Sequence, residues 1–181
     1  GTVAECIFTS NRAVEGGGAF LNAGGRIYGS TFLANSAQTN GGGLHADFTN
    51  AVVSNCVFTG NSAADYGGGL QARGMIVDCT VASNIAGFYG GGLYGPTAGP
   101  LVDRCRFIGN TSSNQGGGLW ITTGGRIRNS LVTGNTANGQ GGGVRLNAGR
   151  MENCTVVSNS GPGGGGFYSS FATSVNCIIY F

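Results

Sequence analysis

Few side chains of this chain can do acid–base chemistry. Its 181 residues contain one histidine, His45, and nine basic residues that are all arginines. The seven carboxylates are Glu5, Glu15, Asp47, Asp65, Asp78, Asp103 and Glu152. The net charge of +2 gives no basic surface for nucleic acid, and no apolar run is long enough to cross a membrane.

The densest group of charges follows one position of a repeat described below. Asp103, Arg128 and Glu152 occupy equivalent positions, and Asp78 and Arg104 share the next one. Opposite charges stacked along a ladder neutralise one another, so we expect an ion-pair stack without catalysis. An alternative function, a polysaccharide lyase or hydrolase, would need acidic and basic groups that converge around Asp103, Arg104, Arg106 and Arg128. No paired-carboxylate spacing indicates glycoside hydrolysis.

All six cysteines also share one repeat position, which Ser30 and Ser130 fill in two other repeats. They are Cys6, Cys56, Cys79, Cys105, Cys154 and Cys177. Parallel side chains on stacked strands lie about 4.8 Å apart, whereas a disulfide needs Cβ atoms about 3.8 Å apart. We therefore predict a buried column of free thiols. A single column cannot surround a metal ion tetrahedrally, so no metal site and no cofactor are expected.

A polar and aromatic column provides the candidate ligand-binding residues. It contains Phe20, His45, Gln71, Tyr94, Trp120, Arg145 and Tyr168, and a second column contains Asn40, Tyr66, Tyr89, Gln115 and Gln140. By strand alternation the first column faces outward. We predict that His45, Tyr94, Trp120, Arg145, Tyr168, Tyr66 and Tyr89 bind a glycan or a surface protein. The alternative is that these rings only stabilise the surface.

A third outward column tests for ice binding, which needs a flat array of threonines. This column reads Ile7, Thr31, Val57, Thr80, Arg106, Leu131 and Thr155. Arg106 and the scattered threonines argue against such a surface.

The elements that position these columns follow from an internal repeat of about 25 residues. An asparagine opens each unit, at Asn11, Asn35, Asn61, Asn84, Asn110, Asn135 and Asn159. A glycine run follows five or six residues later in the first six units, from Gly16, Gly41, Gly67, Gly90, Gly116 and Gly141, and from Gly163 in the seventh. Repeats of this size bury their apolar faces only against their neighbours.

Alternation with a period of two predicts strands within each unit. The cysteine column and the column of Phe8, Phe32, Phe58 and Phe107 point inward together, and Leu44, Leu70, Leu93 and Leu119 mark a second strand. Each unit has two strands and room for a third, and no helical periodicity is present. We predict an all-β parallel β-helix, a solenoid of seven to eight coils that forms one domain over residues 1–181.

The asparagines and glycines are typical of corners between strands. An asparagine tolerates the left-handed backbone conformation, and its amide can bond to neighbouring backbone or to the next asparagine of a ladder. Glycines permit positive φ and close approach of backbones.

These motifs resemble the repeats of polymorphic outer-membrane proteins, whose signatures are Phe-x-x-Asn and Gly-Gly-Ala-(Ile/Leu/Val). This chain has Phe8-Thr-Ser-Asn11 and three further copies of the first signature, and Gly-Gly-Gly-Leu in place of the second at Leu44, Leu70, Leu93 and Leu119. The resemblance implies a right-handed, pectate-lyase-like β-helix on a secreted or surface-exposed bacterial protein, such as an autotransporter passenger or adhesin. It carries over no catalytic residue.

The expected function is therefore a non-catalytic extracellular scaffold that presents its outward aromatic column to a glycan or protein. Both ends show unpaired apolar strands, which suggest either a segment of a longer solenoid or a subunit that stacks head to tail into a fibre.

Overall fold

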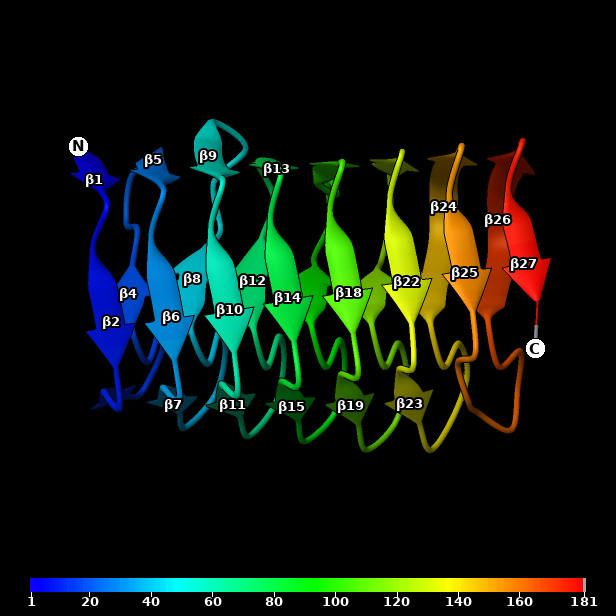
Figure 1. Cartoon of the computed structure of the whole chain (residues 1–181), viewed down its shortest axis with the longest axis horizontal. Coiled ribbons are helices and arrows are strands. Elements are labelled where there is room, and N and C mark those ends of the chain that lie inside the picture. The colour runs from blue at the N-terminus through cyan, green and yellow to red at the C-terminus, as the bar shows by residue number, and fades with distance from the viewer. Residues whose placement is uncertain (181) are drawn as a thin grey trace.

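The computed structural model describes residues 1–180, and this part of the chain is all-β. Parallel strands stack into a solenoid of about seven turns, with equivalent residues about 24 positions apart. In Figure 1 the nearest strands run downward while the chain advances from left to right, so the coil is right-handed. The predicted parallel β-helix is confirmed. No helix of the described residues is long and apolar enough to cross a membrane.

Each complete coil contributes strands to three sheets, which we call A, B and C. Sheet A has two arms, and each coil begins with a strand of the first arm. This arm comprises β1 (Thr2–Ala4), β5 (Gly25–Tyr28), β9 (Ala51–Ser54), β13 (Met75–Val77), β17 (Leu101–Asp103) and β21 (Gly125–Arg128). The second arm comprises β4 (Ala19–Phe20), β8 (Leu44–Ala46), β12 (Leu70–Ala72), β16 (Leu93–Gly95) and β20 (Leu119–Ile121). Two long strands, β24 (Val144–Glu152) and β26 (Phe167–Val175), join the arms into one sheet of 13 strands.

Sheet B has eight strands and lies nearest the viewer in Figure 1. Its members are β2 (Ile7–Thr9), β6 (Thr31–Leu33), β10 (Val57–Thr59), β14 (Thr80–Ala82), β18 (Arg106–Ile108), β22 (Leu131–Thr133), β25 (Thr155–Val157) and β27 (Ile178–Tyr180). Sheet C is formed by two-residue strands, β3 (Arg12–Ala13), β7 (Ser36–Ala37), β11 (Ser62–Ala63), β15 (Ile85–Ala86), β19 (Thr111–Ser112) and β23 (Thr136–Ala137). A typical coil thus has four strands, more than the two or three predicted, because corners divide segments in which the alternating pattern is continuous.

The core consists of apolar columns that run along the solenoid. Phe8, Phe32 and Phe58 stack with ring centroids 4.7 and 4.6 Å apart, and Leu44, Leu70, Leu93 and Leu119 form the facing column. Like residues pack on like residues because every strand pair is parallel and in register, as Phe58 opposite Phe32 illustrates. Each coil therefore buries its apolar side chains against the next coil.

The repeat asparagines bond to one another at the corner between sheets B and C. The side-chain amide of Asn84 donates to Oδ1 of Asn110 at 2.9 Å and to the carbonyl of Phe58 at 3.0 Å, while the Asn84 backbone N–H donates to the same Oδ1. The interpretation that these asparagines adopt positive φ is wrong. The residue before them does so, as at Ser10, Ala34, Gly60 and Ser83.

The glycine corner requires glycine for two reasons. The first glycine of each of the first six runs has positive φ, as at Gly41 and Gly67, with φ of 65° and 66°. A Cβ on the second glycine would collide with the next coil, since at Gly42 it would lie 2.2 Å from the Gly68 carbonyl oxygen. The coils can stack at strand spacing only where no side chain intervenes.

The six cysteines are free thiols in one column. Cys56, Cys79, Cys105 and Cys154 are buried, whereas Cys6 in the first coil is exposed. Burial raises the pKa of the Cys154 thiol to about 11, so this side chain is a neutral, unreactive part of the core.

Candidate functional site

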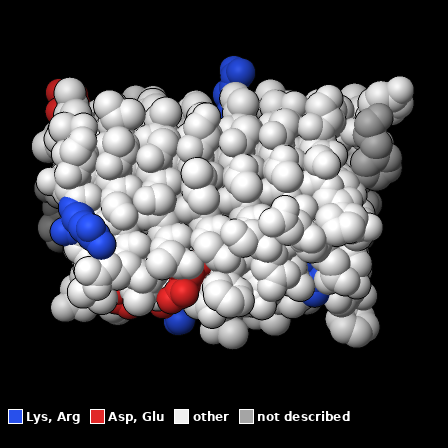
Figure 2. Space-filling model, turned by 90° about the horizontal axis from the view of Figure 1, so that it is seen from below, with Lys and Arg blue, Asp and Glu red and all other residues white. Residues whose placement is uncertain are grey.

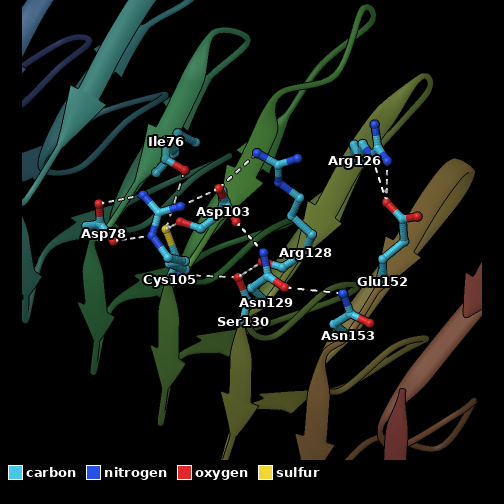
Figure 3. Close-up of polar contacts among 11 residues, drawn as sticks. Ile76, Asp78, Asp103, Cys105, Arg126, Arg128, Asn129, Ser130, Glu152 and Asn153 are labelled. Carbon is cyan, nitrogen blue, oxygen red and sulfur yellow. Dashed lines mark hydrogen bonds and ion pairs between the residues drawn. The ribbon is translucent and has the colours of Figure 1, made fainter. Parts of the chain in front are cut away.

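The charged cluster lies at the corner where the first arm of sheet A turns into sheet B (Figure 3). Asp103, at the end of β17, is only 3% exposed. Its Oδ2 accepts hydrogen bonds from Arg104 at 2.7 Å and Arg128 at 3.0 Å, and its Oδ1 accepts one from Asn129 at 2.9 Å. Arg104 also holds Asp78 with two bonds, at 2.8 and 2.9 Å. The predicted neighbours Asp103 and Arg128, and Asp78 and Arg104, are confirmed.

The ionised carboxylates of this cluster are stabilised by their partners. Burial alone would raise the pKa of Asp103, but hydrogen bonds from Asn129 and Arg128 and the charge of Arg104 hold it below its usual value. The hydrogen bond from Arg104 lowers the pKa of Asp78 in the same way. Neither carboxylate has the raised pKa that suits a general acid or base near neutral pH.

Glu152 belongs to a neighbouring ion-pair group and does not pair with Arg128, its neighbour in the predicted charge stack. Its carboxylate accepts bonds from Arg126 and Arg150, each at 2.7 Å, and the first of these is the main reason that its pKa is lowered. Arg126 and Arg150 lie two residues before Arg128 and Glu152 on their strands. The predicted charge stack did not include this position.

The aromatic column forms a second candidate site on the outer face of the second arm. We use "aromatic–amide stripe" for the outward residues Phe20, His45, Gln71, Tyr94, Trp120, Arg145 and Tyr168 together with Asn40, Tyr66, Tyr89, Gln115 and Gln140 before the glycines. Register pairs Gln71 with Tyr94, Tyr94 with Trp120, and Trp120 with Arg145. The structure thus brings the two columns side by side.

The rings of the stripe interlock. Tyr66 and Tyr89 stack at 5.4 Å, Tyr94 and Trp120 stack at 5.1 Å, and Tyr89 meets Trp120 across the columns at 4.1 Å. The guanidinium carbon of Arg145 lies 4.4 Å from the centroid of the Tyr168 ring. Because the ring faces cover one another along the solenoid axis, the stripe presents ring edges and polar groups outward.

His45 lies beneath its neighbours in the stripe, as does Gln71. It is 6% exposed, with Phe20 edge-on at 4.8 Å, Gln71 Nε2 at 3.2 Å from its Nε2, and Glu15 at 3.5 Å from its Nδ1. Burial lowers the pKa of His45, although Glu15 and Asp47 oppose the shift. A neutral ring that accepts from Gln71 and directs Nδ1–H toward Glu15 fits these contacts.

Several buried polar atoms of this outer face have no hydrogen-bond partner within the described chain. They are Asn40 Oδ1, Gln71 Oε1, Trp120 Nε1, Thr122 Oγ1, Arg145 Nε and Asn147 Oδ1. Thr122 and Asn147 lie two positions beyond the aromatic column, and the same alternation that found that column could have found them. Trp120, Arg145 and Asn147 carry such atoms on side chains that are only half-buried, and unpaired donors and acceptors near the surface can bond to a ligand rich in hydroxyl groups.

Sheet C carries a third feature, a shallow hollow of about 370 Å³ lined by Arg12, Ser36, Gln38, Ser62 and neighbouring alanines. Figure 2 shows the surrounding surface with few charged groups. None of the unpartnered buried polar atoms belongs to these lining residues. The described residues also include no group of three or more His, Cys, Asp or Glu side chains that could hold a metal ion.

Two segments, residues 55–73 and 104–122, match the Chlamydia polymorphic membrane protein repeat. Each contains a Phe-x-x-Asn signature, which begins at Phe58 or Phe107, and the glycines that follow it. No curated protein and no solved structure matches the chain at a significant level. The description of that family is of a membrane protein. The chain is thus a right-handed parallel β-solenoid, and two of its repeats are similar to the Chlamydia polymorphic membrane protein repeat.

Proposed function

We propose that this chain is a non-catalytic cell-surface scaffold that binds an extended glycan through the aromatic–amide stripe. The observation that carries the proposal is the row of unpartnered Trp120, Arg145 and Asn147 atoms, on half-buried side chains beside half-buried aromatic rings. Leaving a buried polar group unpaired costs about 1–3 kcal/mol, so a ligand that reaches these groups gains affinity. Hydroxyl groups of a sugar supply both donors and acceptors.

The spacing of the coils supports a regular polymer as the ligand. Equivalent side chains recur at the strand spacing of about 4.8 Å along the solenoid. An extended chain of pyranose rings repeats over a similar distance, so successive sugars would meet successive coils. A peptide strand on the same axis would advance about 6.6 Å for every two residues and would lose this register.

The alternative of a polysaccharide-cleaving enzyme finds less support. The carboxylates of Asp78, Asp103 and Glu152 are all engaged by arginines, and their pKa values are lowered. Such groups are poor general bases at neutral pH.

Binding to an array of neutral and acidic surface glycans tests the proposal. The variant with Tyr94→Ala, Trp120→Ala and Tyr168→Ala should lose most of the signal of the unchanged chain. A matched control replaces three exposed aromatic residues outside the stripe, Tyr28→Ala, Phe171→Ala and Tyr180→Ala, and should keep it. Equal glycan binding by the stripe variant and the unchanged chain would contradict the proposal. So would the finding that proteinase destroys the partner that the unchanged chain binds.

The location is tested separately in the cells that make the protein. An antibody against the folded solenoid should label intact cells, and added proteinase should remove the label. Labelling only after the cells are broken would contradict surface exposure.

A further inference from the structure

The outer face of sheet B carries two parallel rows of side chains. The first row is Ile7, Thr31, Val57, Thr80, Arg106, Leu131, Thr155 and Ile178, and the second is Thr9, Leu33, Thr59, Ala82, Ile108, Thr133, Val157 and Tyr180. Every neighbouring pair is in register, as Val57 opposite Thr80 and Thr59 opposite Ala82 show. We call this surface the threonine face.

The second row changes the interpretation that the first row gave alone. Six of the eight strands present one threonine beside one alanine or larger aliphatic residue. The threonine changes rows from one coil to the next, at Thr9, Thr31, Thr59 and Thr80, and again at Thr133 and Thr155. The scattered threonines of one column are therefore half of a regular mosaic.

The threonine hydroxyls of this face are free to meet water. Among the described residues, their only side-chain hydrogen bond is a long contact of 3.5 Å between Thr9 and Ser10. Arg106 is the only charged residue in either row. The face is thus an almost uncharged array of methyl and hydroxyl groups, and large parts of it are exposed, including Ile7, Leu33 and Val57.

The array is also flat. Neighbouring strands usually rotate by about 20–25°, which would fan eight strands widely. In Figure 1 the strands from β2 to β27 remain nearly parallel across the whole molecule. Groups on such a sheet repeat about every 4.8 Å along the solenoid and about 6.6 Å along each strand, which gives a two-dimensional lattice.

The size and chemistry of the face exclude other occupants. Eight strands by three residues cover roughly 35 by 10 Å. A stable protein interface buries about 800 Å² on each partner, more than twice this area. A glycan would need rings or amides to contact, and Tyr180 is the one aromatic residue of the rows.

We propose that the threonine face binds ice. Methyl groups restrict the water that surrounds them, and the hydroxyls hydrogen-bond to that water at fixed intervals. A rigid lattice of both groups holds a layer of water in a regular order, and such a layer can join the surface of an ice crystal. Arg106 interrupts the lattice near its centre, because its exposed charge binds water in a different geometry.

The test measures the shape of ice crystals in the protein solution and the gap between its melting and freezing temperatures, which we call the freezing-point gap. The purified chain should separate the melting and freezing temperatures and give faceted crystals. Thr80→Lys with Thr133→Lys should reduce the gap severalfold. Thr111→Lys with Thr136→Lys, which places the same change on sheet C, should leave it unchanged. Arg106→Thr should widen the gap.

Circular dichroism and thermal melting establish that each variant is folded. If the lysine variant does not fold, Thr80→Ser with Thr133→Ser removes only the two methyl groups and should still narrow the gap. The proposal is overturned if the unchanged chain shows no gap and no crystal shaping, or if changes on sheets B and C reduce the gap equally. The variant with Tyr94→Ala, Trp120→Ala and Tyr168→Ala should retain the freezing-point gap of the unchanged chain. Failure of the glycan proposal and failure of the ice-binding proposal can therefore be told apart.

Discussion

The threonine face and the aromatic–amide stripe come from the same coils and share one strand spacing, yet their side chains behave differently. On the stripe, Trp120 lies 4.1 Å from Tyr89 and 5.1 Å from Tyr94, so each coil contacts the next through large rings. On the threonine face, short side chains such as Thr80 and Ala82 form no such contacts across coils. One backbone lattice therefore supports an interlocked surface and an open one.

This difference shows what a solenoid can vary. Inward columns must pack on or hydrogen-bond to their equivalents in the next coil, but outward columns face no such requirement. The length of an outward side chain decides whether neighbouring coils are cross-linked by it. Long aromatic side chains contact one another between coils and expose their polar edges. Threonine and valine side chains are too short for such contacts and form a regular surface that is exposed to solvent.

Loss of the shared frame should have the largest effect and should abolish both surfaces. Asn110→Ala removes the acceptor for two N–H groups of Asn84 and the donor to the Val81 carbonyl, all of them buried. With about 1–3 kcal/mol for each buried unpaired group, we expect a loss of more than about 3 kcal/mol in the free energy of unfolding in urea.

Asn138→Ala serves as the control for that change. Asn138 is exposed in the next coil, and its side chain makes none of the ladder bonds. Equal destabilisation by the two substitutions would mean that the buried ladder adds nothing to the frame.

A pair of truncations compares the two surfaces directly. Trp120→Ala should cost about 2 kcal/mol, since each aromatic contact adds about 0.5–1.5 kcal/mol beyond the area it buries. Ile108→Ala on the threonine face should cost about 1 kcal/mol or less, because that half-buried side chain has no aromatic neighbours to lose. Thermal unfolding of both variants measures the difference, and a larger cost for Ile108→Ala would reverse the comparison.

Mild acid should affect the stripe and spare the threonine face, with the smallest effect of the three. The pKa of His45 is lowered by burial, so the unfolded chain binds a proton more readily than the folded one. Stability should be full above the ordinary histidine pKa of 6.5 and should fall as the pH drops from there through the lowered value.

His45→Gln should remove this pH dependence and leave only the losses near pH 4 and below, where Asp78, Asp103 and Glu152 take up protons. An unfolding free energy of the unchanged chain that stays constant between pH 7 and 5 would contradict the assignment to His45. The freezing-point gap should not change in this pH range.

Much of the fold was predictable because the repeat makes each residue type meet its equivalents. The cysteine, phenylalanine and leucine columns all pack where alternation placed them, and Asp103 meets Arg128 as their shared position predicted. The corners were harder to predict. Ser10 and Ala34 adopt positive φ although neither residue type favours it, and so do Glu5 and Arg104 at the corner before the cysteine column.

The sequence by itself determined the period, the inward columns and the residues available on each outward column. Those follow from spacing, since a side chain on a strand must face one side or the other. Only the tertiary structure decided which outward columns lie next to each other, because the corners set where each strand turns. It paired Glu152 with Arg126 and Arg150, covered His45 beneath its neighbours, and kept flat the sheet that carries the two threonine-containing rows.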